Sequence, residues 1–297
     1  DNVMSNVDEI ISSSKSSIKN NYYDKDEWLK RKQEERTKAY NLIDKTALDV
    51  VSDIDKFKTY LDIQGRFNKY SVGNALLITS QMPNATQLKE FEDWKEAGAL
   101  IKKNATSITI LEPGETYKRS DGSKGMTYNP KKMFDVSQTN YQQINKKINY
   151  DDKVKLIALL KDCPVEIKAT DNIEGVDNKI ADWNINDNII YVKRGEESKD
   201  VFREVAREIA KYCFDSKENE QFENFKSDCV AYMLCKKHGI EIQDFNVELP
   251  IEFTKMDSGE IRKNLNSIRN VTEDINTRMS QYYESVMRNT KNKEHER

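Results

Sequence analysis

The fold of the first half of the chain depends on one stretch, SITILEPGETYKRSDGSKGMTYNPKKMFDVSQ, residues 107–138. It opens with alternating apolar and polar residues and then carries Ser120-Asp121-Gly122, which is typical of a hairpin turn. We therefore expect a small antiparallel sheet. Its strands are predicted at residues 101–103, 107–111, 126–128 and 133–136, with a loop at Pro113-Gly114.

Helical periodicity dominates the sequence before this stretch. Apolar residues recur at spacings of three and four from about Lys25 to Ile63, which predicts one long helix or two in tandem. Before Lys25 the pattern is weak, so we expect a frayed start. A further helix is predicted over residues 72–82, because the residue before Pro83 is disfavoured in a helix. A short helix is predicted over residues 88–97.

A polar segment rich in Asn, Gln and Lys, residues 140–152, predicts a domain boundary. Helices at 154–160, 200–214 and 220–238 and strands at 165–169, 181–184 and 189–192 should follow, which makes the fold class α+β. The expected domains are a helical N-terminal extension (1–45), a domain that leads from helices into the small sheet (46–141), an α+β domain (150–256) and a long C-terminal amphipathic helix (258–290).

The last helix carries an apolar residue at alternating steps of four and three, interrupted at Thr272. Two interpretations fit this stripe. One is a coiled-coil contact with a partner protein, and the other is a long helix that lies along its own domains. We favour the second, because sustained coiled coils show more than three or four clean heptads. After Arg288 the sequence is charged and is expected to be loose.

Composition restricts the class of protein. With 297 residues the chain is long enough for two domains, and a formal net charge of −3 provides no general attraction to phosphate. The four cysteines have no C-x-x-C spacing, which favours reduced thiols in a cytoplasmic protein. No apolar run is long enough to span a membrane. Because the sequence begins at Asp1 rather than at methionine, we expect a piece of a longer protein.

Positive charge is concentrated in one part of this acidic chain. Between residues 101 and 132 there are seven basic and three acidic side chains, a net charge of +4, interleaved with tyrosines. Lysines that contact phosphates and aromatic faces that stack on bases are the combination that binds single-stranded nucleic acid. A solvated hairpin whose lysines protect a sheet edge is the alternative. The candidate residues are Lys102, Lys103, Tyr117, Lys118, Arg119, Lys124, Tyr128, Lys131 and Lys132.

A series of residues in this half follows a recognisable order. It includes Tyr70-Ser71, Asn74, Gln81, Pro83, Trp94, Gly98, Ile101-Lys102-Lys103, Pro113 and Phe134-Asp135-Val136-Ser137-Gln138-Thr139. In this order the sequence resembles the N-terminal domain of ArdC-type antirestriction proteins and, more closely, the LtrC-like proteins of conjugative elements. Asn104 departs from the family, which tends to carry glycine there. The resemblance implies a single-stranded DNA-binding domain of a mobile element and marks Tyr70, Asn74, Gln81, Trp94 and Gln138 as family positions.

The resemblance also implies a zincin-like second domain. In ArdC-type proteins a helix of this domain carries H-E-x-x-H, in which two histidines bind zinc and the glutamate is the general base. The equivalent segment here is Arg207-Glu208-Ile209-Ala210-Lys211, so cations replace both histidines. Zinc is repelled by such groups, and we expect neither metal nor cofactor. Glu223 or Asp228 stands where the third, acidic ligand would fall.

The favoured hypothesis is a non-enzymatic protein that binds single-stranded DNA and carries a degenerate metallopeptidase domain in which Glu208 makes ion pairs. One alternative is an active metal-dependent peptidase with unconventional ligands. Another is a scaffold that contacts conjugation or replication proteins through its C-terminal helix. Antirestriction, replication and transfer all stay open as roles of the protein.

Overall fold

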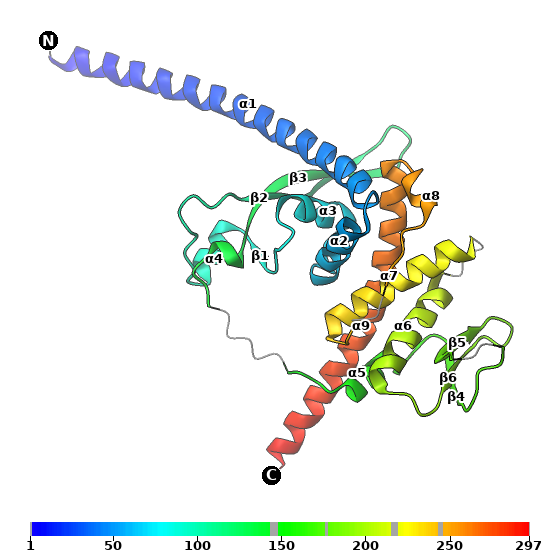
Figure 1. The fold of residues 1–297 in the computed structure, drawn as a ribbon. Coiled ribbons are helices and arrows are strands. Elements are labelled where there is room, and N and C mark those ends of the chain that lie inside the picture. Colours follow the sequence, from blue (N-terminus) through cyan, green and yellow to red (C-terminus); the bar gives the residue numbers. More distant parts are fainter. Residues whose placement is uncertain (1, 143–147, 176–177, 215–218, 243–245, 297) are drawn as a thin grey trace.

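The computed structural model describes residues 2–142, 148–175, 178–214, 219–242 and 246–296. Within these residues, long helices accompany two three-stranded sheets, so the predicted α+β class is confirmed. Figure 1 shows the two sheets on opposite sides of the long C-terminal helix α9 (Ser258–His295). No described helix is long and apolar enough to cross a membrane.

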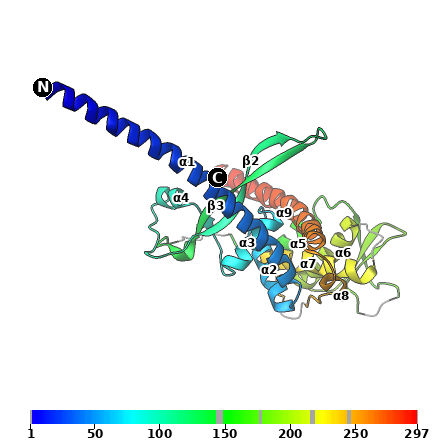
Figure 2. The same ribbon diagram turned by 90° about the horizontal axis from the view of Figure 1, so that it is seen from above.

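Two helices in tandem form the N-terminal part, as predicted. They are α1 (Asn2–Val50) and α2 (Ile54–Arg66). The break between them is stabilised by Asp53, whose carboxylate accepts from the backbone N–H groups of Asp55 and Lys56 at 2.9 and 3.1 Å. The frayed start expected before Lys25 is wrong, because α1 is helical from Asn2 and its first half projects from the body (Figures 1 and 2).

A short helix and a strand replace the helix expected over residues 88–97. The predicted helix before them is confirmed as α3 (Val72–Gln81). The chain then forms β1 (Leu88–Lys89) and α4 (Phe91–Glu96). Leu88 and Lys89 are extended because they pair with Asp135 and Phe134 of β3 (Lys124–Asp135), an interaction between segments that local helical periodicity does not reveal.

The first sheet has the order β1-β3-β2, and β2 (Ile108–Lys118) pairs with β3 along its whole length. The prediction of several short strands and a loop at Pro113-Gly114 is therefore wrong in detail. These residues lie in a β-bulge within β2, as the shift in register between Pro113 and Thr116 shows. The strand expected at 101–103 is reduced to an isolated bridge, in which Ile101 pairs with Thr139. Thr139 directly follows the 3₁₀ turn η1 (Val136–Gln138).

The second half follows the predicted order of helices and strands. In the second sheet β6 (Ile189–Lys193) lies between β4 (Glu166–Thr170), to which it is parallel, and β5 (Ala181–Asn184), to which it is antiparallel. Gly239 ends α7 (Glu220–His238) in a left-handed conformation with a φ of 65°. The elements are α5 (Asp152–Leu160), β4 (Glu166–Thr170), β5 (Ala181–Asn184), β6 (Ile189–Lys193), α6 (Ser198–Phe214), α7 (Glu220–His238) and α8 (Ile251–Thr254).

The C-terminal helix α9 lies along the body of its own chain. Its apolar stripe is buried from Ile261 to Met279, so packing along the chain, the favoured interpretation, describes this helix. Thr272, which interrupts the stripe, is buried and donates its hydroxyl to the carbonyl of Ile268 at 2.8 Å. The segment after Arg288 continues as helix to His295, so the expected loose end is wrong.

Buried apolar side chains from both halves form one continuous core. An aromatic cluster joins α2 to α7 and α8, since the ring of Phe57 lies 5.4 Å from that of Phe225 and 6.1 Å from that of Phe253. Part of the predicted boundary, residues 143–147, lies outside the described residues. The division into domains stays a prediction from composition. The four cysteines are free thiols, as expected.

Candidate nucleic-acid interface

A tight turn over residues 119–123 closes the hairpin. The backbone N–H of Arg119 donates to the carbonyl of Ser123 (2.7 Å), and that of Gly122 donates to the carbonyl of Arg119 (3.0 Å). Gly122 has a φ of 86°, which glycine adopts at little cost. The carboxylate of Asp121 accepts from the hydroxyl and the backbone N–H of Ser123, which lowers the pKa of Asp121. Local residues alone build this turn, as the sequence predicted.

Residues 112–128, which we call the ribbon, project from the body as a two-stranded arm (Figure 2). Almost all of their side chains are exposed or half-buried. The ring of Tyr117 covers Gly125 on the opposite strand, where an added Cβ would lie 2.4 Å from the ring. The guanidinium of Arg119 also lies over the Tyr117 ring, with its carbon 5.7 Å from the ring centre. The ribbon thus presents an ordered aromatic and cationic surface.

Two lysines stand opposite each other near the tip. Lys118 pairs with Lys124 in the strand register, and both are exposed. Among the described residues neither forms an ion pair. Two of the three acids of the ribbon are occupied, since Glu112 pairs with Lys131 and Asp121 accepts from Ser123, whereas Glu115 is exposed. The ribbon as a whole carries three cations and three acids, so its net charge is zero. The excess of +4 predicted for residues 101–132 comes from Lys102, Lys103, Lys131 and Lys132, which lie outside the ribbon.

The remaining predicted lysines lie elsewhere. Lys131 contacts Glu112 and Glu90 at 3.1 and 3.5 Å. Burial acts to lower the pKa of Lys131, but these two acids outweigh it and the pKa is raised. Lys132 donates to the hydroxyl of Thr109 at 2.8 Å. Both lysines therefore hold the base of the ribbon.

Lys102 and Lys103 lie in the loop before β2. Lys102 donates to the carbonyl of Ser137 at 2.9 Å, whereas Lys103 is exposed. Since a strand rises about 3.3 Å per residue, the length of β2 separates this loop from Lys118 by about 30 Å. The structure thus brings together Tyr117, Lys118, Arg119 and Lys124, with Tyr128 at the base, and does not bring Lys102 or Lys103 to them.

Two family positions on α3, Asn74 and Gln81, form hydrogen bonds with backbone groups at the free edge of β2. The side-chain amide of Asn74 donates to the carbonyl of Leu111 and accepts from its N–H, both at 2.8 Å. Gln81, two helical turns later, does the same with Thr109 at 2.8 and 2.9 Å. The two amides replace a neighbouring strand and satisfy an edge that would otherwise be open. We call this arrangement the amide clamp; its sequence signal is the seven-residue spacing.

The other family positions are also structural. Trp94 is fully buried and its indole N–H donates to the carbonyl of Phe134 at 2.8 Å. The side chain of Gln138 donates to the carbonyl of Thr106 and accepts from the N–H of Asp135. Tyr70 is half-buried, with its ring 5.6 Å from that of Phe67. The family pattern therefore marks the support of the ribbon rather than its exposed surface.

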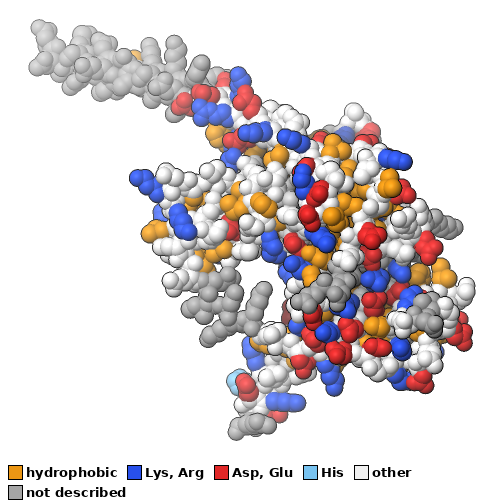
Figure 3. Space-filling model, in the orientation of Figure 1, with side chains coloured by type: hydrophobic (Ala, Val, Ile, Leu, Met, Phe, Trp, Pro, Cys, Tyr) orange, Lys and Arg blue, Asp and Glu red, His pale blue; other side chains and the backbone are white. Residues whose placement is uncertain are grey.

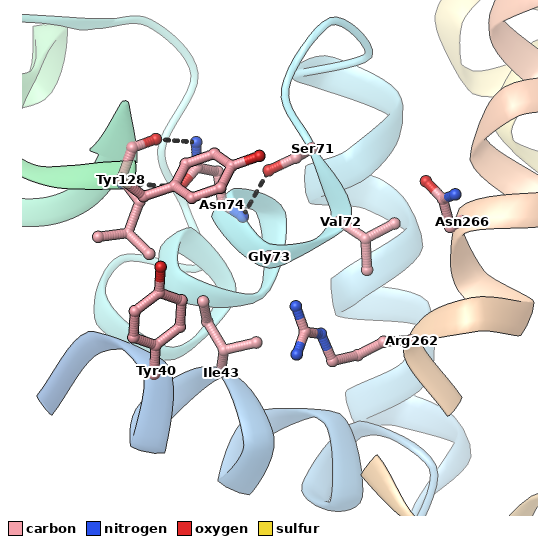
Figure 4. A pocket seen from close by; sticks show the side chains of 10 residues that line it. Tyr40, Ile43, Ser71, Val72, Gly73, Asn74, Tyr128, Arg262 and Asn266 are labelled. Atoms are coloured by element: carbon pink, nitrogen blue, oxygen red, sulfur yellow. Dashed lines mark hydrogen bonds between the residues drawn. The ribbon is translucent and has the colours of Figure 1, made fainter. Parts of the chain in front are cut away.

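A pocket lies beside the base of the ribbon, between α1, α3, β3 and α9 (Figure 4). Its volume is about 250 Å³. Most of its lining could not be recognised from local sequence patterns, because the lining residues come from five segments, in α1, α3, β2, β3 and α9. The lining is Tyr40, Ile43, Ser71, Val72, Gly73, Asn74, Leu111, Tyr128, Arg262 and Asn266.

In the second half, Glu208 sits in a buried ion-pair network on α6. Its side chain is 2% exposed, and its carboxylate lies 3.4 Å from Lys211 and 3.5 Å from Lys179. Lys179 also contacts Asp182 of β5. Burial acts to lower the pKa of Lys179, but Asp182 and Glu208 outweigh it and the pKa is raised. The expected pairing of Glu208 with Lys211 is present, and Lys179 is a partner that the sequence did not indicate.

Arg207, beside Glu208, is paired separately. Its guanidinium lies 2.6 Å from Asp228 of α7 and 2.9 Å from Glu204. Burial raises the pKa of Asp228, and the charges of Arg207 and Lys211 partly offset this. Of the two acids proposed for the third ligand position, Asp228 thus contacts the segment through Arg207, and Glu223 stands five residues earlier in α7. Acidic and basic side chains intermingle over α6 and α7 (Figure 3).

The residues at this segment do not fit a zinc or manganese ion. Cations occupy both positions that the resemblance assigns to histidines, and the two nearby acids are already paired with them. His238 is bound to Asn276 at 2.8 Å, at the end of α7. Within the part of the chain that the structure describes, no three His, Cys, Asp or Glu side chains form a group that could hold a metal ion.

Comparison with known proteins places this architecture. No family model matches the chain. The uncharacterized protein pXO2-81 of Bacillus anthracis is 22% identical over 285 residues, covering 76% of this chain and 48% of that protein. The chain therefore spans about half the length of this curated relative.

Two crystal structures of the antirestriction protein ArdC from plasmid R388 share the fold. The metal-free structure has a TM-score of 0.54 at 13% identity and covers 81% of this chain and 98% of that chain. The Mn(II)-bound structure has a TM-score of 0.50 at 14% identity and covers 71% and 85%. The resemblance to ArdC-type proteins is therefore confirmed at the level of the fold.

Proposed function

We propose that this protein binds single-stranded DNA through the ribbon and acts on DNA of a conjugative or other mobile element. One observation carries the proposal: Tyr117, Lys118, Arg119 and Lys124 are gathered on a projecting arm whose base is held by the amide clamp. The ArdC fold supports it, since the solved neighbour is named as an antirestriction protein of a plasmid.

The tip of the ribbon favours an anionic ligand. Like charges directly opposite each other destabilise a sheet, and Lys118 and Lys124 are such a pair. A phosphate placed between them would relieve this repulsion. Tyr117 is 48% exposed, and the exposed part of its ring can stack only on a base that is not already stacked inside a duplex, so single strands should bind better than duplex.

We further propose that the second half is not a peptidase. The proposal is supported by the pairing of Glu208 with Lys179 and Lys211, which neutralises the carboxylate that would act as general base. It is also supported by the pairing of Arg207 with Asp228. These two sets of ion pairs join α6 to β5 and α7.

Charge reversal tests the first proposal. The variant carrying Lys118→Glu, Arg119→Glu and Lys124→Glu should lose at least tenfold in affinity for a labelled single strand. The slope of log K against log salt should fall by about 2, at roughly 0.7 per phosphate contact. Gel-shift and anisotropy measurements with single- and double-stranded oligonucleotides provide both values.

The matched control reverses three exposed cations near the end of α9, Arg288, Lys291 and Lys293. It changes the net charge equally and should leave affinity within about twofold at moderate salt, because screening weakens distant exposed charges. Equal binding by the ribbon variant and the wild type would refute the assignment, and so would a preference for duplex.

Metal content tests the second proposal. Purified wild type should retain no stoichiometric zinc or manganese after dialysis, whereas the variant Arg207→His with Lys211→His should gain zinc, because it places two imidazoles one turn apart near Asp228. Each single variant serves as a control and should bind at least tenfold more weakly. Stoichiometric metal in the wild type, with peptidase activity lost in Glu208→Gln, would show an active enzyme.

A further inference from the structure

The pocket between α1, α3, β3 and α9 contains polar groups that the fold itself does not use. The hydroxyls of Tyr40 and Tyr128 and the amide of Asn266 have no hydrogen-bond partner among the described residues. Both tyrosine side chains are partly exposed, at 38% and 39%. Figure 4 shows the hydroxyl of Tyr40 directed toward the side of the pocket where Tyr128 lies. Aromatic faces and unsatisfied polar groups therefore border the same space.

A cation stands at the other side of this pocket. Arg262 of α9 extends its guanidinium toward Ile43 and Val72 (Figure 4). Its only described ion pair is with Asp44 at 3.5 Å, and its side chain is 40% exposed. Such an exposed pair contributes little to stability, so a phosphate can compete for the guanidinium. The planar guanidinium of an arginine also presents two parallel N–H donors that match a phosphate, a geometry that the ammonium of a lysine lacks.

The pocket is continuous with the ribbon. Tyr128 belongs to both, and Arg36 of α1 fixes its backbone by donating to the Tyr128 carbonyl at 2.7 Å and to the Asn129 side chain at 3.1 Å. The volume of about 250 Å³ lies below the roughly 300–1,000 Å³ of pockets for drug-sized ligands. It therefore suits one nucleotide unit rather than two.

We propose that this pocket receives one unstacked nucleotide of the DNA strand that lies along the ribbon, with its base against Tyr40 and Tyr128 and a phosphate at Arg262. The proposal rests on the proposed binding of single-stranded DNA and adds where the strand leaves the ribbon. It assigns to α1 and α9 a part in binding the strand, which the sequence did not indicate for either helix. The chemical class recognised is a base with its own phosphate.

Two probes separate base from backbone. One is an oligothymidylate, and the other is a strand of equal length that contains only abasic sites. Tyr40→Ala and the bulkier, non-aromatic Tyr40→Leu should each weaken the oligothymidylate about fivefold or more, since stacking on an aromatic side chain contributes at least that much per base. Neither variant should change affinity for the abasic strand.

The Arg262 variant should weaken the binding of both probes, unlike the Tyr40 variants. Arg262→Gln should weaken both probes and lower the salt slope by about 0.7, as expected for one phosphate contact on a single strand. Arg288→Gln lies on the same helix in an exposed pair with Glu284, and Trp28→Ala is an exposed aromatic on α1, so these are the matched controls. Both should bind like the wild type, and thermal unfolding confirms that each variant is folded.

The outcomes distinguish this inference from the proposal on which it rests. If the wild type binds both probes, and charge reversal on the ribbon abolishes binding while Tyr40→Ala and Tyr40→Leu change nothing, the pocket is wrong and the ribbon stands. If the Tyr40 variants weaken both probes equally, the contact is not with a base and the inference fails. If the wild type binds neither probe, both proposals fail together.

Discussion

The ribbon and the α6 segment use the same kinds of side chain in opposite ways. On α6, Arg207 contacts Asp228 and Lys211 contacts Glu208, and the Glu208 side chain is almost fully buried. On the ribbon, Lys118 and Lys124 face solvent and each other. A cation that neutralises a buried acid is part of the structure, because removing it would leave an uncompensated charge in a low dielectric. An exposed cation without an acid remains available to a ligand.

The two regions also differ in how backbone groups are satisfied. The amide clamp saturates the edge of β2 next to the exposed ribbon, so that a rigid base supports a surface that contributes little to stability. The α6 segment is buried at Glu208 and partly exposed at Arg207 and Lys211, and its charged groups pair with neighbouring side chains. Variants should therefore separate stability from the proposed DNA binding, and the expected changes in the free energy of unfolding differ widely between the two regions.

The amide clamp should give the largest effect. Asn74→Ala with Gln81→Ala leaves backbone N–H and carbonyl groups of Leu111 and Thr109 without partners, and we expect a loss of about 4 kcal/mol in the free energy of unfolding. Urea denaturation measures it. Ser80→Ala on the exposed side of α3 is the control and should change stability by less than about 0.5 kcal/mol. A double variant no less stable than this control would show that the amides do not hold β2.

Acid should act on the second half through His238. Burial, with the charges of Lys237 and Lys155, lowers the pKa of His238 to about 4, although its bond to Asn276 opposes the shift. Between pH 6.5 and 4 the unfolded chain binds the proton and the folded chain does not, so this contribution is complete above pH 6.5 and is lost on acidification. It amounts to at most about 3 kcal/mol.

The measurement is the free energy of unfolding as a function of pH, for the wild type and for His238→Gln. The difference between them should change steadily between pH 6.5 and 4 and stay constant above pH 7. Parallel curves over the whole range would contradict a neutral, buried His238.

Glu208→Gln tests whether the ion pairs on α6 contribute to stability and not to DNA affinity. It removes the charge shared by Lys179 and Lys211 while keeping the shape, and we expect a loss of about 2 kcal/mol because both lysines are partly exposed. Affinity for single-stranded DNA should not change. The control, Glu166→Gln, breaks an exposed pair with Lys168 and should cost about 0.5 kcal/mol or less. A change in DNA affinity without a change in stability would reverse the roles assigned to the two regions.

Neutralising the tip should have the smallest effect on stability. Lys118→Ala with Lys124→Ala removes a repulsive pair, so the free energy of unfolding should change by no more than about 0.5 kcal/mol and in the stabilising direction. The salt slope for single-stranded DNA should nevertheless fall by about 1.4. Anisotropy titrations at several salt concentrations test this, and an unchanged slope would remove both lysines from the interface.

Local patterns predicted most of the elements. The turn at Ser120-Asp121-Gly122 forms from its own hydrogen bonds, and the helices around Glu208 and Asp228 follow from apolar spacing. Strand lengths were wrong around Pro113, because a bulge depends on the partner strand. The short strand β1 was missed for the same reason, since its pairing with β3 joins residues almost fifty positions apart.

The candidate site divides in the same way. Residue identity and neighbours within a few positions were enough to predict the cations of the hairpin, the turn that presents Lys118, and the cations Arg207 and Lys211 where the resemblance implies histidines. The folded chain was needed to show that Asn74 and Gln81 bind the edge of β2, that Lys131 is held by acids, and that Tyr40, Tyr128 and Arg262 border one pocket. These contacts join segments far apart in the chain, and packing of the whole core fixes their distances, which no local pattern encodes.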